Sequence, residues 1–234
     1  MSVRVGGGIS TQLNPFGQEP QTSSKASQTP EIGRQIKTAL FGRPKPTILD
    51  PAQFPQLAAQ LRLLRRYKKK LAAMAGDNEE DYDICLAEGS IAMIDESGMI
   101  YVGVGFLEAC KLRPELLVGV LAHEIGHRPK RWDAYKTKRA LTREELEELC
   151  RHEETRADIF AGKALAEMEM RCEPLCEFLL KIEGTPHPEY FPAEVRAEVV
   201  RDAHEGREYR TENRKKLFPE YDRMNAPKGH LGEY

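Results

Sequence analysis

Two histidines four residues apart, with a glutamate between them, end an almost wholly apolar segment. His123, Glu124 and His127 belong to the pentapeptide HEIGH, and the six residues before it, LVGVLA, carry no polar side chain. This pattern predicts a buried helix from Pro114 to His127, with Pro129 setting its end. Residues i and i+4 share a helix face, so both imidazoles point the same way. Because buried polar groups need partners, the pattern predicts a cation held by both histidines.

A third ligand for that cation is expected on a second long helix. Zinc at a hydrolytic site takes three protein ligands and leaves one position for water, and two histidines with one glutamate are a known set. Glu154 and Asp158 stand four apart on a face shared with Ala157. We predict Glu154 as the ligand and Asp158 as the acceptor of a free ring N–H from a ligating histidine. Glu153, about 100° round the helix, is the less favoured alternative.

Three segments, in order and spacing, resemble the gluzincin metallopeptidases of the HtpX and CaaX prenyl-protease group. They are IYVGVGFLE from Ile100, ELLVGVLAHEIGH from Glu115 and ETRAD from Glu154. The resemblance spans roughly Ile84 to Leu165. Unlike the membrane-embedded members of that group, the chain shows no transmembrane segment, so soluble relatives are the closer comparison.

The resemblance implies a zinc-dependent peptidase, in the first instance an endopeptidase, that acts on peptide or protein substrates. It implies one Zn²⁺ per chain, held by His123, His127 and Glu154, with Glu124 as general base and Asp158 supporting a ligand. The alternative that stays open is a catalytically silent binding or scaffold protein that retains the metallopeptidase fold.

Two further features are carried over by resemblance. His187-Pro188 is similar to a pair found downstream in the family, followed by an arginine that Arg196 matches, which implies a substrate or transition-state contact for His187. An isolated His-Pro pair in a surface loop is the alternative. The segment before the metal helix is implied to be the edge strand that binds extended substrate. It comprises Met99, Ile100, Tyr101, Val102, Gly103 and Val104.

The fold class expected from these patterns is α+β and mostly helical. Apolar periodicity predicts helices over 54–74, 114–127, 142–168 and 193–203, the third opened by a capping box of Thr142 and Glu145. Short β-like segments lie at 84–86, 90–94 and 99–104, two of them expected to pair as a hairpin. We predict a zincin-like metallopeptidase core with a small antiparallel sheet packed on the HExxH helix.

The domain organisation follows from composition along the chain. Residues 1–46 are rich in Gly, Ser, Thr, Gln and Pro with few large apolar side chains, which predicts a flexible extension. Its role as a plain tail, a linker, a pro-segment or a non-Sec secretion address is open. The metallopeptidase domain is placed at 47–221 and a loose tail at 222–234.

Charge and cysteine content narrow the partners and the location. A net charge of -2 offers no field to attract nucleic acid, and the basic run from Arg65 to Lys70 is expected to be a solvated helix face. No apolar run is long enough to span a membrane, and no Sec signal is recognisable. The five cysteines favour reduced thiols and a cytoplasmic location, with non-Sec export left open. A second metal site at Cys172 and Cys176 is disfavoured, because no nearby ligand pair completes it.

Overall fold

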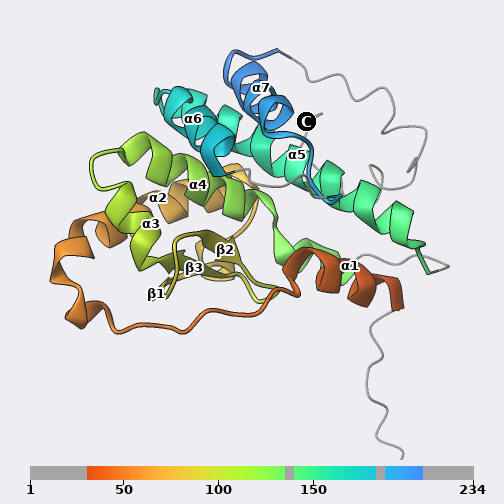
Figure 1. Cartoon of the computed structure of the whole chain (residues 1–234), viewed down its shortest axis with the longest axis horizontal. Helices are drawn as coiled ribbons and strands as arrows, with labels where there is room; N and C mark the ends of the chain where they lie inside the picture. Colours follow the sequence, from red (N-terminus) through yellow and green to blue (C-terminus); the bar gives the residue numbers. More distant parts are fainter. Residues whose placement is uncertain (1–30, 135–139, 183–187, 208–234) are drawn as a thin grey trace, which may run out of the picture.

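The computed structural model describes residues 31–134, 140–182 and 188–207. Within these ranges the chain is mostly helical with one small three-stranded sheet, which confirms the α+β class (Figure 1). The α-helices are α1 Glu31–Phe41, α2 Ala58–Met74, α3 Val104–Ala109, α4 Pro114–Gly126, α5 Arg143–Glu167, α6 Glu173–Ile182 and α7 Ala193–His204. The strands are β1 Asp83–Ala87, β2 Ala92–Ile94 and β3 Met99–Gly103.

The sheet is mixed, so the expected antiparallel sheet is wrong. Strand order is β1-β3-β2, with β3 antiparallel to β2 but parallel to β1. The predicted hairpin is β2–β3, and β1 pairs on the other side of β3. Met99 to Gly103 therefore form the central strand, Val104 already belongs to α3, and the edge strand expected there is instead β2. The central strand is buried on both sides because Ile100 and Val102 are apolar and Tyr101 is covered as well.

The hairpin turn depends on one buried carboxylate. Asp95 Oδ1 accepts hydrogen bonds from Ser97 N (2.9 Å), Ser97 Oγ (2.6 Å) and Met99 N (3.1 Å). Its Oδ2 lies 2.6 Å from Lys45 Nζ and 3.2 Å from the hydroxyl of Tyr101. Burial alone raises the pKa of Asp95, but Lys45 and the hydrogen bonds outweigh it and lower the pKa to about 2.

Replacing Asp95 with Asn is expected to lower the free energy of unfolding by about 2 kcal/mol at pH 7. The folded pKa is below the unfolded value, so the charge stabilises the fold above about pH 4 and this contribution is lost as the pH falls towards about 2. Denaturant unfolding of both proteins between pH 7 and pH 2 measures the difference. If the difference in free energy of unfolding between the two proteins stayed constant over that range, the stabilising role of the Asp95 charge would be contradicted.

Helix α1 lies inside the segment expected to be a flexible extension, so that expectation is wrong for residues 31–41. Ile36 is fully buried and Phe41 nearly so, both within the main core. Ile32, Ile36 and Leu40 stand four apart, a helical spacing that the polar composition of the segment hid. Residues 1–30 and the predicted tail at 222–234 lie outside the described residues.

Helix α4 occupies the middle of the molecule. Figure 1 shows the sheet on one side of α4 and α5, α6 and α7 on the other. Ten of its residues are buried, as its apolar sequence predicts. It lies close to α5 where Gly126 faces Ala157: a Cβ added at Gly126 would lie 3.0 Å from Ala157 Cα. The two small residues therefore let the two helices approach at the level of His127.

The predicted start of α5 is confirmed. Thr142 Oγ1 accepts from Glu145 N at 3.2 Å, and Glu145 Oε2 accepts from Thr142 N at 2.9 Å, which is the reciprocal capping box. These bonds satisfy two backbone donors at the N-terminal end of the helix. They therefore determine where α5, the helix that carries Glu154, begins.

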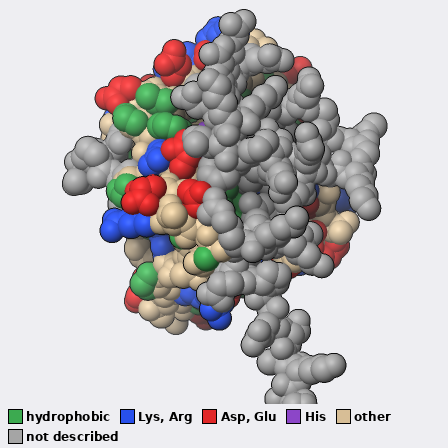
Figure 2. Space-filling view, turned by 90° about the vertical axis from the view of Figure 1, so that its right-hand side faces the viewer, with side chains coloured by type: hydrophobic (Ala, Val, Ile, Leu, Met, Phe, Trp, Pro, Cys, Tyr) green, Lys and Arg blue, Asp and Glu red, His purple; other side chains and the backbone are tan. Residues whose placement is uncertain are grey.

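On the face drawn in Figure 2 the described charges are mixed, and the basic run of the sequence lies on α2. In the view of Figure 2, acidic and basic side chains are interspersed over the part of the surface that the structure describes. On α2, Arg65, Arg66, Lys69 and Lys70 are exposed, as expected of a solvated face. None of the described helices combines the length and apolar character needed to cross a bilayer.

Candidate metal centre

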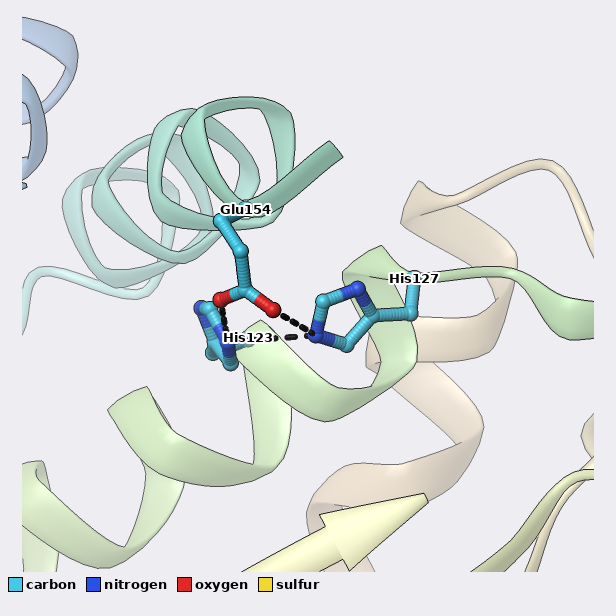
Figure 3. A group of neighbouring side chains, drawn as sticks. All are labelled: His123, His127 and Glu154. Carbon is cyan, nitrogen blue, oxygen red and sulfur yellow. Dashed lines mark hydrogen bonds and ion pairs between the residues drawn. The ribbon is translucent and has the colours of Figure 1, made fainter. Parts of the chain in front are cut away.

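Three side chains from two helices converge on one point. His123 and His127 project from α4, and Glu154 reaches towards them from α5 (Figure 3). The two Nε2 atoms are 3.2 Å apart. Glu154 Oε2 lies 3.3 Å from His123 Nε2, and Oε1 lies 3.8 Å from His127 Nε2. The three residues thus form a group that can hold a metal ion, as the sequence predicts.

The spacing of these atoms fits a small tetrahedral cation. Ligand atoms about 2.1 Å from one zinc ion at tetrahedral angles are about 3.4 Å from each other. The 3.2 Å between the two Nε2 atoms and the 3.3 Å between His123 Nε2 and Glu154 Oε2 lie near that value, and the 3.8 Å contact of His127 Nε2 is to the other carboxylate oxygen, Oε1. Two histidine nitrogens and one carboxylate are also the donor types that zinc takes at hydrolytic sites. Geometry and chemistry of the donors therefore agree.

Asp158 and Arg196 support the cluster from behind. Asp158 Oδ1 lies 2.9 Å from His123 Nδ1, the contact predicted for it. Arg196 of α7 donates through Nε to Asp158 Oδ2 at 2.8 Å, through Nη2 to Asp158 Oδ1 at 3.0 Å, and to Glu154 Oε2 at 3.2 Å. One guanidinium therefore fixes two carboxylates, and Asp158 in turn leaves His123 Nε2 free to bind a cation.

Glu153, the alternative ligand, lies on a different face of α5. It is fully buried and pairs with the guanidinium groups of Arg131 and Arg156, the second at 2.9 Å from its Oε2. Arg156 also donates to the carbonyl of Gly126 at 2.7 Å. Glu153 therefore ties the end of α4 to α5 and takes no part in the convergent group.

The chain leaves α4 sharply after the second histidine. Arg128 has a left-handed backbone, with φ of 44°, which is uncommon for a residue with a side chain. Its guanidinium holds Asp77 through two bonds of 2.9 and 2.7 Å. Tyr82 donates to the same carboxylate at 2.6 Å and to the carbonyl of Ile125 at 3.3 Å. These contacts stabilise the strained exit and hold His127 at the helix end.

Burial and neighbouring charges move the pKa values of the two histidines apart. Burial alone lowers the pKa of His123, but Asp158 and Glu154 overcome it and raise the value to about 10. For His127 burial prevails and lowers the pKa to about 4. The pKa of Glu154 falls well below its usual value, because both histidines and Arg196 outweigh its burial. A metal ion that bound here would therefore displace a proton from His123.

Glu124 lies beside this group at the wall of a cavity of about 330 Å³. It is 8% exposed, and burial raises its pKa to about 7. The backbone of Ile94 on strand β2 hydrogen-bonds its carboxyl group. The carboxylate is therefore held near the metal-binding atoms with a pKa suited to taking up and releasing protons near neutrality.

The cavity lining is part polar and part apolar. Its polar part includes the three convergent residues with Glu124, Asp158 and Arg196. Its apolar part, called the apolar wall below, is contributed largely by α6 and includes Val120, Leu175, Phe178, Leu179, Ile182 and Phe191. Strand β2 and the preceding Ile91 also line the cavity. Such a cavity suits an extended chain with a large apolar side chain.

Sequence reasoning did not single out two further residues of this cavity. Arg43, just after α1, and Tyr190, just before α7, both line it and contact each other through the guanidinium and the hydroxyl. Neither residue is part of a spacing pattern that marks a site, and only the fold brings them together. His187 lies outside the described residues, so its predicted substrate contact stays a prediction.

Comparison of the chain with protein-family models, curated proteins and solved structures finds no match. Conclusions about function therefore rest on the residues and geometry of this site.

Replacing Asp158 with Asn is expected to lower zinc affinity by about 10- to 100-fold. An amide can present its NH₂ group to His123, which favours the wrong ring tautomer, and it cancels one of the two charges that Arg196 holds. Competition with a chromophoric chelator measures the affinity. Asp202, a half-buried acid on α7 that pairs with Arg207, provides an Asp→Asn control that should leave the zinc affinity unchanged. Equal affinity of the parent and the Asp158 variant would contradict the supporting role of Asp158.

Proposed function

We propose that this protein is a zinc-dependent peptidase with a zincin-like core. The observation that carries the proposal is the convergence of His123 Nε2, His127 Nε2 and the Glu154 carboxylate, with Glu124 buried beside them in one cavity. His123, His127 and Glu154 would hold the ion. Once bound there, zinc supplies Lewis acidity towards a carbonyl oxygen and lowers the pKa of water.

Glu124 supplies the proton transfers of the reaction. As general base it accepts a proton from the attacking water, and as general acid it passes that proton to the departing amine nitrogen. Its pKa of about 7, raised by burial, keeps both steps accessible near neutral pH. The reaction splits the peptide bond and yields a carboxylate and an amine.

Strand β2 is the surface on which an extended peptide is expected to lie. It is an edge strand, and Ala92, Met93 and Ile94 line the cavity next to Glu124. A substrate strand added there gains backbone hydrogen bonds independent of its sequence. The apolar wall from α6 then receives one of its side chains, which favours a bulky apolar residue near the cleaved bond.

Cleavage of a diverse peptide mixture, followed by mass spectrometry, tests the proposal. The zinc-loaded protein is expected to cut; removal of zinc by a chelator should abolish cutting, and added zinc should restore it. A folded protein that binds zinc and cuts nothing would favour the binding or scaffold alternative. Cutting that persists undiminished in chelator would remove zinc from the mechanism.

A further inference from the structure

Arg43 has no role in the proposed reaction, although it lines the cavity. It follows α1, is exposed, and lines the same cavity as Glu124 and the metal-binding group. Its positive charge lowers the pKa of Glu124 against the larger effect of burial, so it lies within electrostatic reach of that carboxylate. Arg43 therefore faces the space where a substrate must lie.

Arg43 differs from the other arginine of the cavity in its partners. Arg196 is committed to the carboxylates of Asp158 and Glu154. Among the described residues, Arg43 has no carboxylate within ion-pair distance, and its polar contact is the hydroxyl of Tyr190. The guanidinium carbons of Arg43 and Arg196 lie 5.5 and 5.2 Å from the centre of the Tyr190 ring. Tyr190 thus holds Arg43 in place without neutralising it.

The positive charge of Arg43 is in excess over the negative charges of the cavity. Its carboxylates are Glu124, Glu154 and Asp158. On the proposed function, which this step rests on, the two charges of zinc and that of Arg196 balance all three. The charge of Arg43 then remains to be matched by whatever enters the cavity. A guanidinium presents paired N–H donors that fit a carboxylate.

We infer that Arg43 is a specificity residue that binds a carboxylate of the substrate close to the cleaved bond. The carboxylate is that of an Asp or Glu side chain or that of the peptide's own C-terminus. Both sources present the same two oxygens. In the second case the protein would remove residues from chain ends, which the sequence alone does not distinguish from internal cleavage.

Two matched peptide libraries test the inference, the second identical to the first except that every Asp and Glu is replaced by Asn and Gln. Each is made with a free C-terminus and with an amidated one, so the two sources of carboxylate are separated. The parent is expected to cleave carboxylate-bearing peptides with a kcat/KM about 10- to 100-fold higher than their neutral counterparts, and Arg43→Gln should remove that preference. Arg43→Lys should keep part of it, and Arg65→Gln, an exposed arginine on α2, should keep all of it.

Binding separates this inference from the proposed peptidase activity. The same libraries are bound to zinc-loaded Glu124→Gln protein, with and without Arg43→Gln, and the captured peptides are quantified. Enrichment of carboxylate peptides that depends on Arg43 supports the inference even if the parent cleaves nothing. Equal capture of carboxylate-bearing peptides and of amidated peptides without Asp or Glu, or an Arg43→Gln loss that is equal for these two groups, would overturn it.

Discussion

Replacing Glu124 with Gln will remove peptide cleavage and leave zinc bound. The amide has the same shape as the carboxylate, so the buried pocket beside Ile94 keeps its packing, but the amide cannot accept a proton from water. General acid–base groups contribute about 10²- to 10⁴-fold to rate, and kcat should fall by that amount with little change in KM. Steady-state cleavage of a peptide found in the mixture experiment measures both constants.

The control for this variant is Glu115→Gln, which changes an acid in the first turn of the same helix, where it pairs with Arg171. It should cleave at the parental rate. Zinc content of both variants, measured by elemental analysis, should equal that of the parent. A Glu124→Gln protein as active as the parent would refute Glu124 as the base, whereas an inactive variant that had lost its zinc would make Glu124 a metal-binding group.

Replacing Glu154 with Gln will weaken zinc binding more than the change at Asp158. The variant removes the anionic ligand itself, so the loss should exceed the roughly 10- to 100-fold that follows removal of a supporting partner. It also takes from Arg196 one of its two carboxylates. The affinity is read from competition with a chromophoric chelator, and cleavage at limiting zinc should fall in parallel.

Glu147→Gln on the same helix is the matched control, because Glu147 pairs with the exposed Arg143, remote from the cluster. Circular dichroism should show both variants folded. Parental zinc affinity in a folded Glu154→Gln protein would mean that the ion is held elsewhere, and the peptidase proposal would fail with it.

The candidate metal-binding group was predictable because short-range rules determine most of it. The i, i+4 spacing puts His123 and His127 on one helix face, and the apolar stretch before them requires that face to be buried. Glu154 could be singled out over Glu153 because only one of two adjacent helical residues can face the partner helix. The structure places both acids accordingly. The peptidase activity and the identity of the metal stay predictions.

The sheet and helix α1 were less predictable, for different physical reasons. Alternation along a strand shows that it pairs but not with which neighbour or in which direction, so the parallel pairing of β1 with β3 was missed. For that reason β3 was predicted as the edge strand beside the cavity, whereas that strand is β2. Helix α1 is short and lies in a segment of largely polar composition, and it is stabilised by burying Ile36 and Phe41 against distant elements. Arg43 and Tyr190 meet only through that tertiary packing.

The hydrogen bonds that Arg196 donates to Glu154 and Asp158 connect the candidate metal centre to α7, the last helix that the structure describes. A protein is synthesised from its N-terminus, so α4 and α5 leave the ribosome before α7 does. Until α7 docks, Glu154 and Asp158 lie side by side on α5 without the guanidinium that holds them. A chain synthesised only as far as α5 therefore carries the three residues of the candidate metal centre without the guanidinium contacts that hold two of its carboxylates.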